Sequence, residues 1–550
     1  MTSVESSPRN ALLPSLAVAR SGRKSALVAV LVLALLGLFW GWHVFRFLCD
    51  DAYIGFRYVG NAVAGLGLTW NPAPFRAVEG YTSFLWEILL VAIWKLTGLD
   101  PTRTAAELGL ICAVGSVLHV WRMAQAIPLE ARLERWRPVW VALVLLGTLS
   151  NRTFLAWTSS GLETSLFVML VLGWVDAMAR RRYLSVTIHA ALLALCRPDG
   201  LLLLAASLAL LAHDWRRVRP WVVLPLLAVP IHLLWRHAVY GFWLPNTYYA
   251  KATGSFFESG WRYLASWMLE YAWWFFAGVG LVALVVILRR SKRWPLQAWH
   301  IAVGGLVANA AWYTLWLGGD HFEFRIYAHF VPLAWLGLLG LLGAMQASVR
   351  ATAVTFVAQL ALSLPIPWTH WAITHELTHI QTRGLTTRVA PHLPGVMRPY
   401  ASAFDELQVW LESHAVCVRH REHVAFLERQ IQLLPPRPST AEVASAWSDP
   451  QDIPAMTVVA AGAIGWSLPK IAIIDMHGLN DAVTARNPDL HPGRGMTHER
   501  KPLPGYADSF RPNVTYRHRE LIITPREHPL GPAEIEALEL RWWTQIGIAR

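Results

Sequence analysis

Long apolar runs separated by short basic clusters are the feature that most constrains how this chain folds. Clusters of Arg and Lys between apolar runs are typical of cytoplasmic loops, so each run is predicted to cross a membrane once. Only 15% of the chain is charged, whereas soluble proteins carry about 25%. We therefore predict a polytopic α-helical membrane protein with about eleven transmembrane helices. The runs are residues 26–45, 104–124, 138–150, 164–178, 185–196, 200–212, 221–238, 268–288, 298–317, 327–346 and 352–366.

The same alternation predicts the domain organisation. Residues 1–24, which include the basic stretch RSGRK, form a cytoplasmic N-terminal tail before an uncleaved anchor. Residues 25–366 form the transmembrane domain, whose first outer loop is 46–103, and residues 367–550 form a small soluble α/β domain outside the membrane. The net charge of +12 lies in the loops rather than on one face, so no nucleic-acid partner is expected.

Two segments need separate interpretation. The apolar stretch 84–98 carries Glu87 and Lys95 and would break the alternation if it spanned, so we expect a helix on the outer surface. A twelve-span arrangement that includes it is the alternative. In the soluble part, 457–475 predicts two strands around a turn and 532–543 a helix, whereas 418–453 is rich in Pro and charge and is expected to be a poorly ordered insertion.

Polar, non-basic stretches all fall on the outer side of this topology. Each carries an ionisable residue at the end of an apolar helix, where burial is expensive unless the group faces a wet cavity and a partner. Because they face one compartment, we expect them to form one cavity. The stretches are residues 49–58, 71–86, 158–164, 196–200, 240–251 and 318–327.

The adjacent carboxylates Asp50 and Asp51 are the first candidates for chemistry. Two neighbouring carboxylates repel each other and raise one pKa unless a cation is near, and Arg57 follows within about two helical turns. Such a group can deprotonate a hydroxyl nucleophile or hold a divalent cation. An exposed interfacial pair that merely ends the membrane helix is the structural alternative.

Cations on the outer side suggest a phosphate. Lys251 follows four aromatic residues and could bind a lipid phosphate as a point charge, although such aromatics are equally typical of an interfacial belt. Arg325 and His321, beside Asp320, offer a second cationic site, for which a snorkelling Arg is the alternative.

The sequence HELTH at 375–379 matches the HExxH zinc motif. A membrane metalloprotease is therefore an alternative function, but the segment is locally rich in His and no third ligand has diagnostic spacing. A transporter would also explain charges at membrane depth, but it needs no large outer domain and more often shows repeated halves, which this sequence lacks.

Several blocks together resemble one family. The stretch from CDDAYIGFRY to EGYTSFLW (49–86), then TSSGLETSLF, LALCRPDGLLL, YGFWLPNTYYAK, GGDHFEFR and AGAIGWSLPKIAIIDMHGLNDAVTAR, occur in the order found in bacterial GT-C glycosyltransferases that include the AftB-type terminal β-(1→2) arabinofuranosyltransferases. The resemblance runs from residue 26 to about residue 525. GWSLP (465–469) and GRGMTHERK (493–501) depart from the family pattern, so the acceptor stays open.

The resemblance implies a GT-C fold and an inverting transfer of a sugar, β-D-arabinofuranose as first choice, from a polyprenyl-phosphate donor to an envelope polysaccharide acceptor. It implies a monomer in the bacterial inner membrane, with its site and C-terminal domain in the periplasm, and no obligatory metal or cofactor. Another polyprenyl-phosphate sugar is the alternative. The implied roles are catalysis by Asp50 or Asp51, phosphate binding by Lys251, Arg325, Arg197 and Arg57, and sugar or acceptor binding by Glu79, Tyr81, Glu163, Asn246, Asp320, Asp475 and His477.

Overall fold

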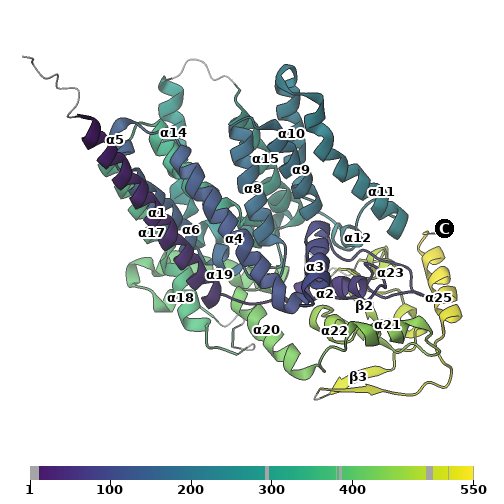
Figure 1. The fold of residues 1–550 in the computed structure, drawn as a ribbon. Coiled ribbons are helices and arrows are strands. Elements are labelled where there is room, and N and C mark those ends of the chain that lie inside the picture. Colours follow the sequence, from purple (N-terminus) through teal and green to yellow (C-terminus); the bar gives the residue numbers. More distant parts are fainter. Residues whose placement is uncertain are drawn as a thin grey trace, which may run out of the picture.

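The computed structural model describes residues 12–290, 296–378, 381–382, 387–490, 499–517 and 519–548, with side chains described from residue 22. Part of the predicted tail, His379 of HELTH and residues 493–498 lie outside these ranges. Figure 1 shows a bundle of long helices with a smaller C-terminal part along one end of it.

Every predicted apolar run is helical. Six stretches are long and apolar enough to cross a membrane, namely Gly22–Val44, Pro101–Ala126, Pro220–Tyr240, Trp273–Arg290, Arg325–Ala344 and Val349–Thr374. The predicted multi-pass helical membrane protein is thereby confirmed. The helices of the bundle are α1 Leu12–Val44, α4 Pro101–Ala126, α6 Arg137–Leu149, α8 Thr164–Ala179, α9 Tyr183–Cys196, α10 Gly200–His213, η3 Pro220–Leu227, α11 Ala228–Tyr240, α14 Trp273–Arg290, α15 Ala298–Ala311, η4 Trp312–Leu317, α16 Phe330–Ala344, α17 Val349–Ser363 and α18 Pro365–Thr374.

The last apolar helix extends beyond the predicted boundary at residue 366. Pro365 begins α18 directly after α17, because proline is tolerated in the first turn of a helix, where its missing N–H is not needed. The chain therefore remains helical as far as Thr374. Around the bundle lie the shorter helices α5 Ala131–Glu134, α7 Arg152–Ala156, η2 Trp215–Arg217, α12 Asn246–Lys251, α13 Phe257–Glu270 and η5 Arg325–Tyr327.

Helices α2 (Asp50–Val63) and α3 (Phe84–Thr97) lie at the end of the bundle that faces the C-terminal part (Figure 1). Helix α3 corresponds to the predicted surface helix, and it ends at Gly98, whose left-handed conformation is easily adopted only by glycine. Its buried residues are Trp86, Glu87 and Leu90. The crossing number and the sidedness of the loops stay predictions.

The C-terminal part is a small α/β unit, as predicted. Its elements are η6 Ala390–His392, η7 Gly395–Met397, α19 Arg398–Ala415, α20 His420–Leu433, α21 Thr440–Ser448, β1 Ala455–Val458, α22 Gly462–Ser467, β2 Ala472–Asp475, α23 Ala482–Ala485, α24 Tyr506–Ser509, β3 Val514–Arg517, β4 Glu520–Ile523 and α25 Pro532–Gln545. The predicted helix over 532–543 is α25.

The two strands predicted in this unit are present, but the turn predicted between them and the poor order predicted for 418–453 were wrong. The strands of 457–475 are β1 and β2, which pair in parallel from Ala455↔Ala472 to Val458↔Asp475. Parallel strands cannot be joined by a tight turn, and α22 forms the crossover. The stretch 418–453 is ordered. Its prolines lie between α20 and α21, and α21 begins with a capping box of Ser439 and Glu442.

A buried ion cluster joins the bundle to the C-terminal unit. Arg419, just before α20, lies 2.5 Å from Glu270 and 3.2 Å from Glu323, and Arg152 of α7 pairs with the same Glu323. Glu323 also accepts the backbone N–H of His420 at 2.7 Å. All four ionic side chains are almost fully buried. The cluster therefore holds the loop 318–327 against the chain that leads into α20.

Candidate functional site

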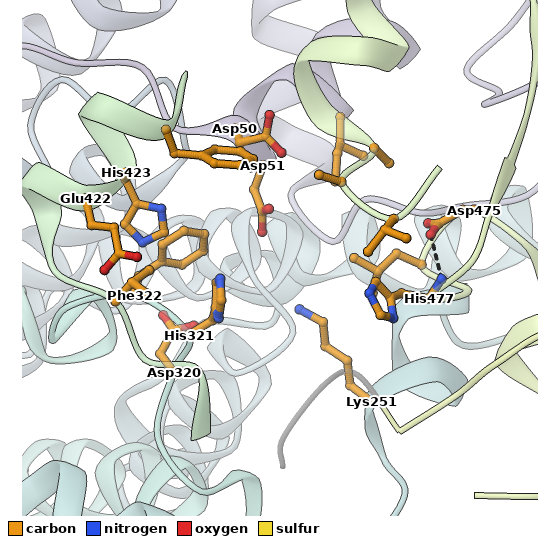
Figure 2. A pocket seen from close by; sticks show the side chains of 17 residues that line it. Asp50, Asp51, Lys251, Asp320, His321, Phe322, Glu422, His423, Asp475 and His477 are labelled. Carbon is orange, nitrogen blue, oxygen red and sulfur yellow. Dashed lines mark hydrogen bonds between the residues drawn. The ribbon is translucent and has the colours of Figure 1, made fainter. Parts of the chain in front are cut away.

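Two adjoining cavities lie between the bundle and the C-terminal unit. They have volumes of about 330 Å³ and 300 Å³ and share the side chains of Asp51, Lys251 and Asp320. The first cavity is bounded by α2, the 318–327 loop, α20 and residues 459–461 and 475–479 (Figure 2). The second extends along α2 and α3 toward residues 244–252 and 312–317. The expected outer-side cavity thus consists of two compartments that meet at Asp51.

Helix α2 separates the two adjacent carboxylates. Cys49 caps the helix in an extended conformation, so both Asp50 and Asp51 lie in its first turn, where the helix dipole favours negative charge. Successive helical residues differ in direction by about 100°. Figure 2 shows the Asp51 carboxylate pointing into the cavity toward Lys251 and His321, whereas that of Asp50 points away.

Asp50 anchors the C-terminal unit. Its Oδ1 accepts the backbone N–H of Ala463 at 2.9 Å, at the start of α22. A Cβ on Gly462 would lie 2.0 Å from the carbonyl oxygen of Asp50, so only glycine permits this approach. Burial raises the pKa of Asp50 to about 6, and the Ala463 N–H opposes that shift. Asp50 therefore titrates close to neutrality.

Asp51 is differently placed. It lines both cavities, and within the described ranges its carboxylate has no hydrogen-bond or ion-pair partner. His321 lies close enough for Asp51 and Asp320 to raise its pKa, although burial lowers that pKa overall. Asp50 also lines the first cavity, but its Oδ1 accepts the Ala463 N–H, so Asp51 is the member of the pair whose carboxylate is not already engaged by the described residues.

The basic residues of the site fall into two kinds. Arg325 pairs with Asp320 at 2.8 Å, and Arg197 pairs with Glu163 and Asp199 at 2.9 Å each. These arginines line the second cavity with their charges already compensated. Lys251, at the C-terminal end of α12, lines both cavities and has no carboxylate within ion-pair distance among the described residues.

The C-terminal unit supplies the far wall of the first cavity. Asp475 and His477, the predicted acceptor-binding residues of this unit, line it (Figure 2). The Asp475 carboxylate accepts the backbone N–H groups of His477 and Asn480 at 2.9 Å each, and so braces the turn after β2. Glu422 and His423 of α20 also line this cavity. The sequence interpretation missed them because it placed them in a poorly ordered insertion.

Of the residues predicted for the sugar or acceptor, Tyr81, Glu163 and Asp320 line the second cavity. Tyr81 does so with its hydroxyl 3.0 Å from that of Tyr240, and Glu163 does so beside Arg197. Glu79 and Asn246 do not line either cavity. Arg236 pairs with Glu79 at 2.6 Å, and Asn246 donates to the carbonyls of Gly478, Leu479 and Asp481 at 2.8 to 3.2 Å. Their polar groups fasten the 240–251 segment to its surroundings.

The structure also places Arg57 differently from its predicted role in phosphate binding. This residue is fully buried and lines neither cavity. Its guanidinium donates to the carbonyls of Trp70, Gly465, Leu468 and Ile471 and to Asn71 Oδ1, at 2.7 to 3.1 Å. It also lies over the Trp70 ring, 4.7 Å from the centroid. Arg57 therefore fastens the first outer loop to α22 and β2 and is not placed to bind phosphate.

No family model matches the chain. The chain resembles an arabinofuranosyltransferase. It is 30% identical over 278 residues to the terminal β-(1→2)-arabinofuranosyltransferase of Mycobacterium tuberculosis, a match that covers 46% of this chain and 43% of that protein. The chain thus matches less than half the length of this relative, and the resemblance noted from the sequence blocks is confirmed over that part.

Two solved structures are similar at low identity. ArnT from Cupriavidus metallidurans bound to undecaprenyl phosphate has a TM-score of 0.47 and 12% identity, over 81% of this chain and 85% of that chain. The arabinosyltransferase EmbB from Mycobacterium smegmatis has a TM-score of 0.35 and 15% identity, over 76% of this chain and 42% of that chain.

The described residues of the HELTH motif, 375–378, are not helical. Helix α18 ends at Thr374, so His375 only follows the helix and Leu377 lies beyond it. HExxH chemistry requires both histidines on one helical face. The side chain of Glu376 is 87% exposed. The described part of the motif therefore gives no support to the metalloprotease alternative.

Proposed function

We propose that this chain is an inverting membrane glycosyltransferase of the GT-C type. It takes a sugar, β-D-arabinofuranose as first choice, from a polyprenyl-phosphate donor and transfers it to an envelope polysaccharide. The observation that carries the proposal is the position of Asp51, whose carboxylate has no partner among the described residues and lies where the two cavities meet, with Lys251 lining the same junction. The partial match to an arabinofuranosyltransferase supports the choice of sugar.

The second cavity suits the lipid donor. Its outer rim includes the exposed apolar side chains of Leu244, Tyr248, Trp312 and Trp316, which can contact an isoprenoid chain at the membrane surface. Lys251 lies further in, where it can pair with the donor phosphate as a point charge. Arg325 and Arg197 lie beside it with compensated charges and add hydrogen-bond donors without excess positive charge.

The first cavity suits the acceptor. Its wall carries Glu422, His423, Asp475 and His477, which offer acceptors and donors to sugar hydroxyls. An acceptor hydroxyl that enters here reaches Asp51 from the side opposite the donor. A single displacement requires the acceptor oxygen and the leaving phosphate on opposite faces of the anomeric carbon, so the transferred sugar is placed at the junction of the two cavities.

The reaction then follows in one step. Asp51 accepts the proton of the acceptor hydroxyl as that oxygen bonds to the anomeric carbon of the donor sugar. The bond from that carbon to the phosphate oxygen breaks, and the polyprenyl phosphate leaves with the electron pair. Lys251 stabilises the growing negative charge on the phosphate in a site with little water. Attack opposite the leaving group inverts the anomeric configuration.

The setting of this reaction is part of the proposal. We place the enzyme in a bacterial inner membrane as a monomer, with the cavities and the C-terminal unit in the periplasm. No divalent cation is obligatory, although the acidic pair could bind one. Among the described residues no group of three His, Cys, Asp or Glu side chains is arranged to hold a metal ion.

Transfer by the purified full-length protein in detergent tests the proposal. The donor is decaprenyl-phosphoryl-arabinose and the acceptor an oligo-arabinofuranoside, with and without chelator. Wild type should form product, and Asp51→Asn should lower the rate about 10²–10⁴-fold, which is the usual contribution of a general base. Asp50→Asn should lower it by less than about tenfold, because an amide oxygen can still accept the Ala463 N–H.

The matched control is Asp449→Asn, an exposed carboxylate outside both cavities. It should leave the rate unchanged, and so should the chelator. A greater loss in Asp50→Asn than in Asp51→Asn would reassign the base. No product from folded wild type with intact donor would remove arabinose, and other polyprenyl-phosphate sugars would then be tried.

A further inference from the structure

A buried carboxyl group in the second cavity has no role in the reaction described so far. Glu87 of α3 is 3% exposed and lines this cavity. Its Oε1 accepts a hydrogen bond from Ser83 Oγ at 3.2 Å, whereas its Oε2 is buried and has no hydrogen-bond partner in the part of the chain that the structure describes. A buried polar atom without a partner is costly, so a native structure normally provides one from outside the chain.

Glu87 and the proposed base Asp51 differ from the other carboxylates of this cavity. Glu163 and Asp199 both pair with Arg197, and Asp320 pairs with Arg325. No Arg, Lys or His within the described ranges lies within ion-pair distance of Glu87. Besides Asp51, Glu87 is therefore a carboxyl of this cavity that keeps unused hydrogen-bonding capacity.

The position of Glu87 relative to Asp51 is also informative. The Glu87 carboxyl lies against Gly55, where a Cβ would come within 2.5 Å of Oε1. Gly55 follows Asp51 by four residues on α2, which corresponds to about one helical turn or 6 Å along the axis. Asp51 and Glu87 thus face the second cavity one turn apart, a spacing comparable to the width of a sugar ring.

We propose that Glu87 is a sugar-recognition residue, which hydrogen-bonds a hydroxyl of the donor's glycosyl group as a neutral carboxylic acid. The inference rests on the proposed function and adds to it the group that distinguishes glycosylated donor from bare polyprenyl phosphate. A neutral acid offers one O–H donor and one free acceptor to a hydroxyl. It also avoids the repulsion that a second carboxylate would exert on the departing phosphate.

The electrostatics of the site agree with a neutral acid. Burial raises the pKa of Glu87 to about 8, the nearby Glu163 adds to the shift, and the Ser83 hydroxyl opposes it. The carboxyl is thus mostly protonated at neutral pH. As the pH rises through about 8 the proton is lost, and the group can no longer donate.

The test compares binding of two ligands to the purified full-length protein. One is decaprenyl-phosphoryl-arabinose and the other is sugar-free decaprenyl phosphate, so the ratio of their affinities isolates recognition of the sugar. The variants are Glu87→Gln, which keeps the shape and a donor group, and Glu87→Met, which keeps only the approximate volume. Glu258→Gln, a carboxyl 62% exposed on α13, is the matched control.

Glu87→Met should reduce the preference for the glycosylated ligand about five- to tenfold, the usual effect of losing one hydrogen bond. Its affinity for decaprenyl phosphate should match wild type. Glu87→Gln should keep the preference at pH 7. Between pH 7 and 9 the preference should fall in wild type and stay constant in Glu87→Gln, a difference that a purely structural role would not produce.

The contrary outcomes are distinct. If Glu87→Met keeps the full preference, or weakens both ligands equally, the inference is wrong and the proposed function stands. A wild-type alkaline profile that Glu87→Gln reproduces would also overturn it. If wild type shows no preference for glycosylated ligands and no transfer, the proposed function itself fails, and this inference fails with it.

Discussion

Arg57→Met should loosen the C-terminal unit while leaving donor binding intact. In the structure its guanidinium makes five hydrogen bonds that join residues 70–71 to α22 and to the chain leading into β2. The Arg57 side chain lines neither cavity. Methionine retains the packing over Trp70 but supplies no donor. The buried carbonyls of Gly465 and Ile471 would then lose the hydrogen bonds that they accept from Arg57.

The size of the effect follows from these contacts. Hydrogen bonds to a charged group contribute about 1.5–3 kcal/mol each, and they are not additive, so we expect a total on the order of 5 kcal/mol. For a unit of 150–250 residues each kcal/mol lowers the unfolding midpoint by about 2–4 °C. The midpoint of the detergent-solubilised protein should therefore fall by about 10–20 °C.

The assay is thermal unfolding with a parallel measurement of decaprenyl phosphate affinity in the folded fraction. Arg511→Met is the control, because it removes a half-exposed ion pair with Glu534 in the same unit and should cost about 1 kcal/mol or less. If Arg57→Met keeps the wild-type midpoint but binds decaprenyl phosphate more weakly, the fastening role is refuted, and the role in phosphate binding predicted from the sequence is the correct one.

Two further predictions concern the acidic pair and the ion cluster. Because burial raises the folded-state pKa of Asp50 to about 6, above its ordinary value of 3.8, the ionised carboxyl costs stability above pH 6, and acidification from pH 7 to pH 5 should raise the unfolding midpoint more in wild type than in Asp50→Asn; an equal pH dependence of the two midpoints would contradict this. Arg419→Met leaves Glu270 and Glu323 buried with less compensation and should cost about 3–5 kcal/mol, measured as a lower unfolding midpoint; Arg388→Met, whose partner Glu406 is exposed, should change little, and equal midpoints would refute the reasoning.

The membrane helices could be predicted from the sequence because they depend on local composition alone. Any run of about 20 apolar residues must hydrogen-bond its own backbone in lipid, so a helix follows directly. The gathering of outer-side polar residues could be predicted for a related reason, since burial at membrane depth demands partners. Asp51, Lys251 and Asp320 were found in this way.

The roles of individual side chains could not be predicted by this route. Arg57 lies in the same polar stretch as Asp51, but its distant partners around 465–471 are invisible in a local reading. Glu79 and Asn246 likewise take partners that only the tertiary fold brings near. For 418–453, prolines and charges suggested disorder, whereas in the structure the prolines lie between α20 and α21, and α20 supplies both Glu422 and His423.

The joint between Asp50 and Ala463 has a consequence for how the protein is made. One wall of the first cavity comes from α2, near the start of the chain, and the opposite wall from residues 459–479. During synthesis α2 is made early, and it stays without the opposite wall until most of the chain has been made. The site is therefore completed late in translation, so that chains interrupted before residue 459 carry the proposed base but not the wall that encloses it.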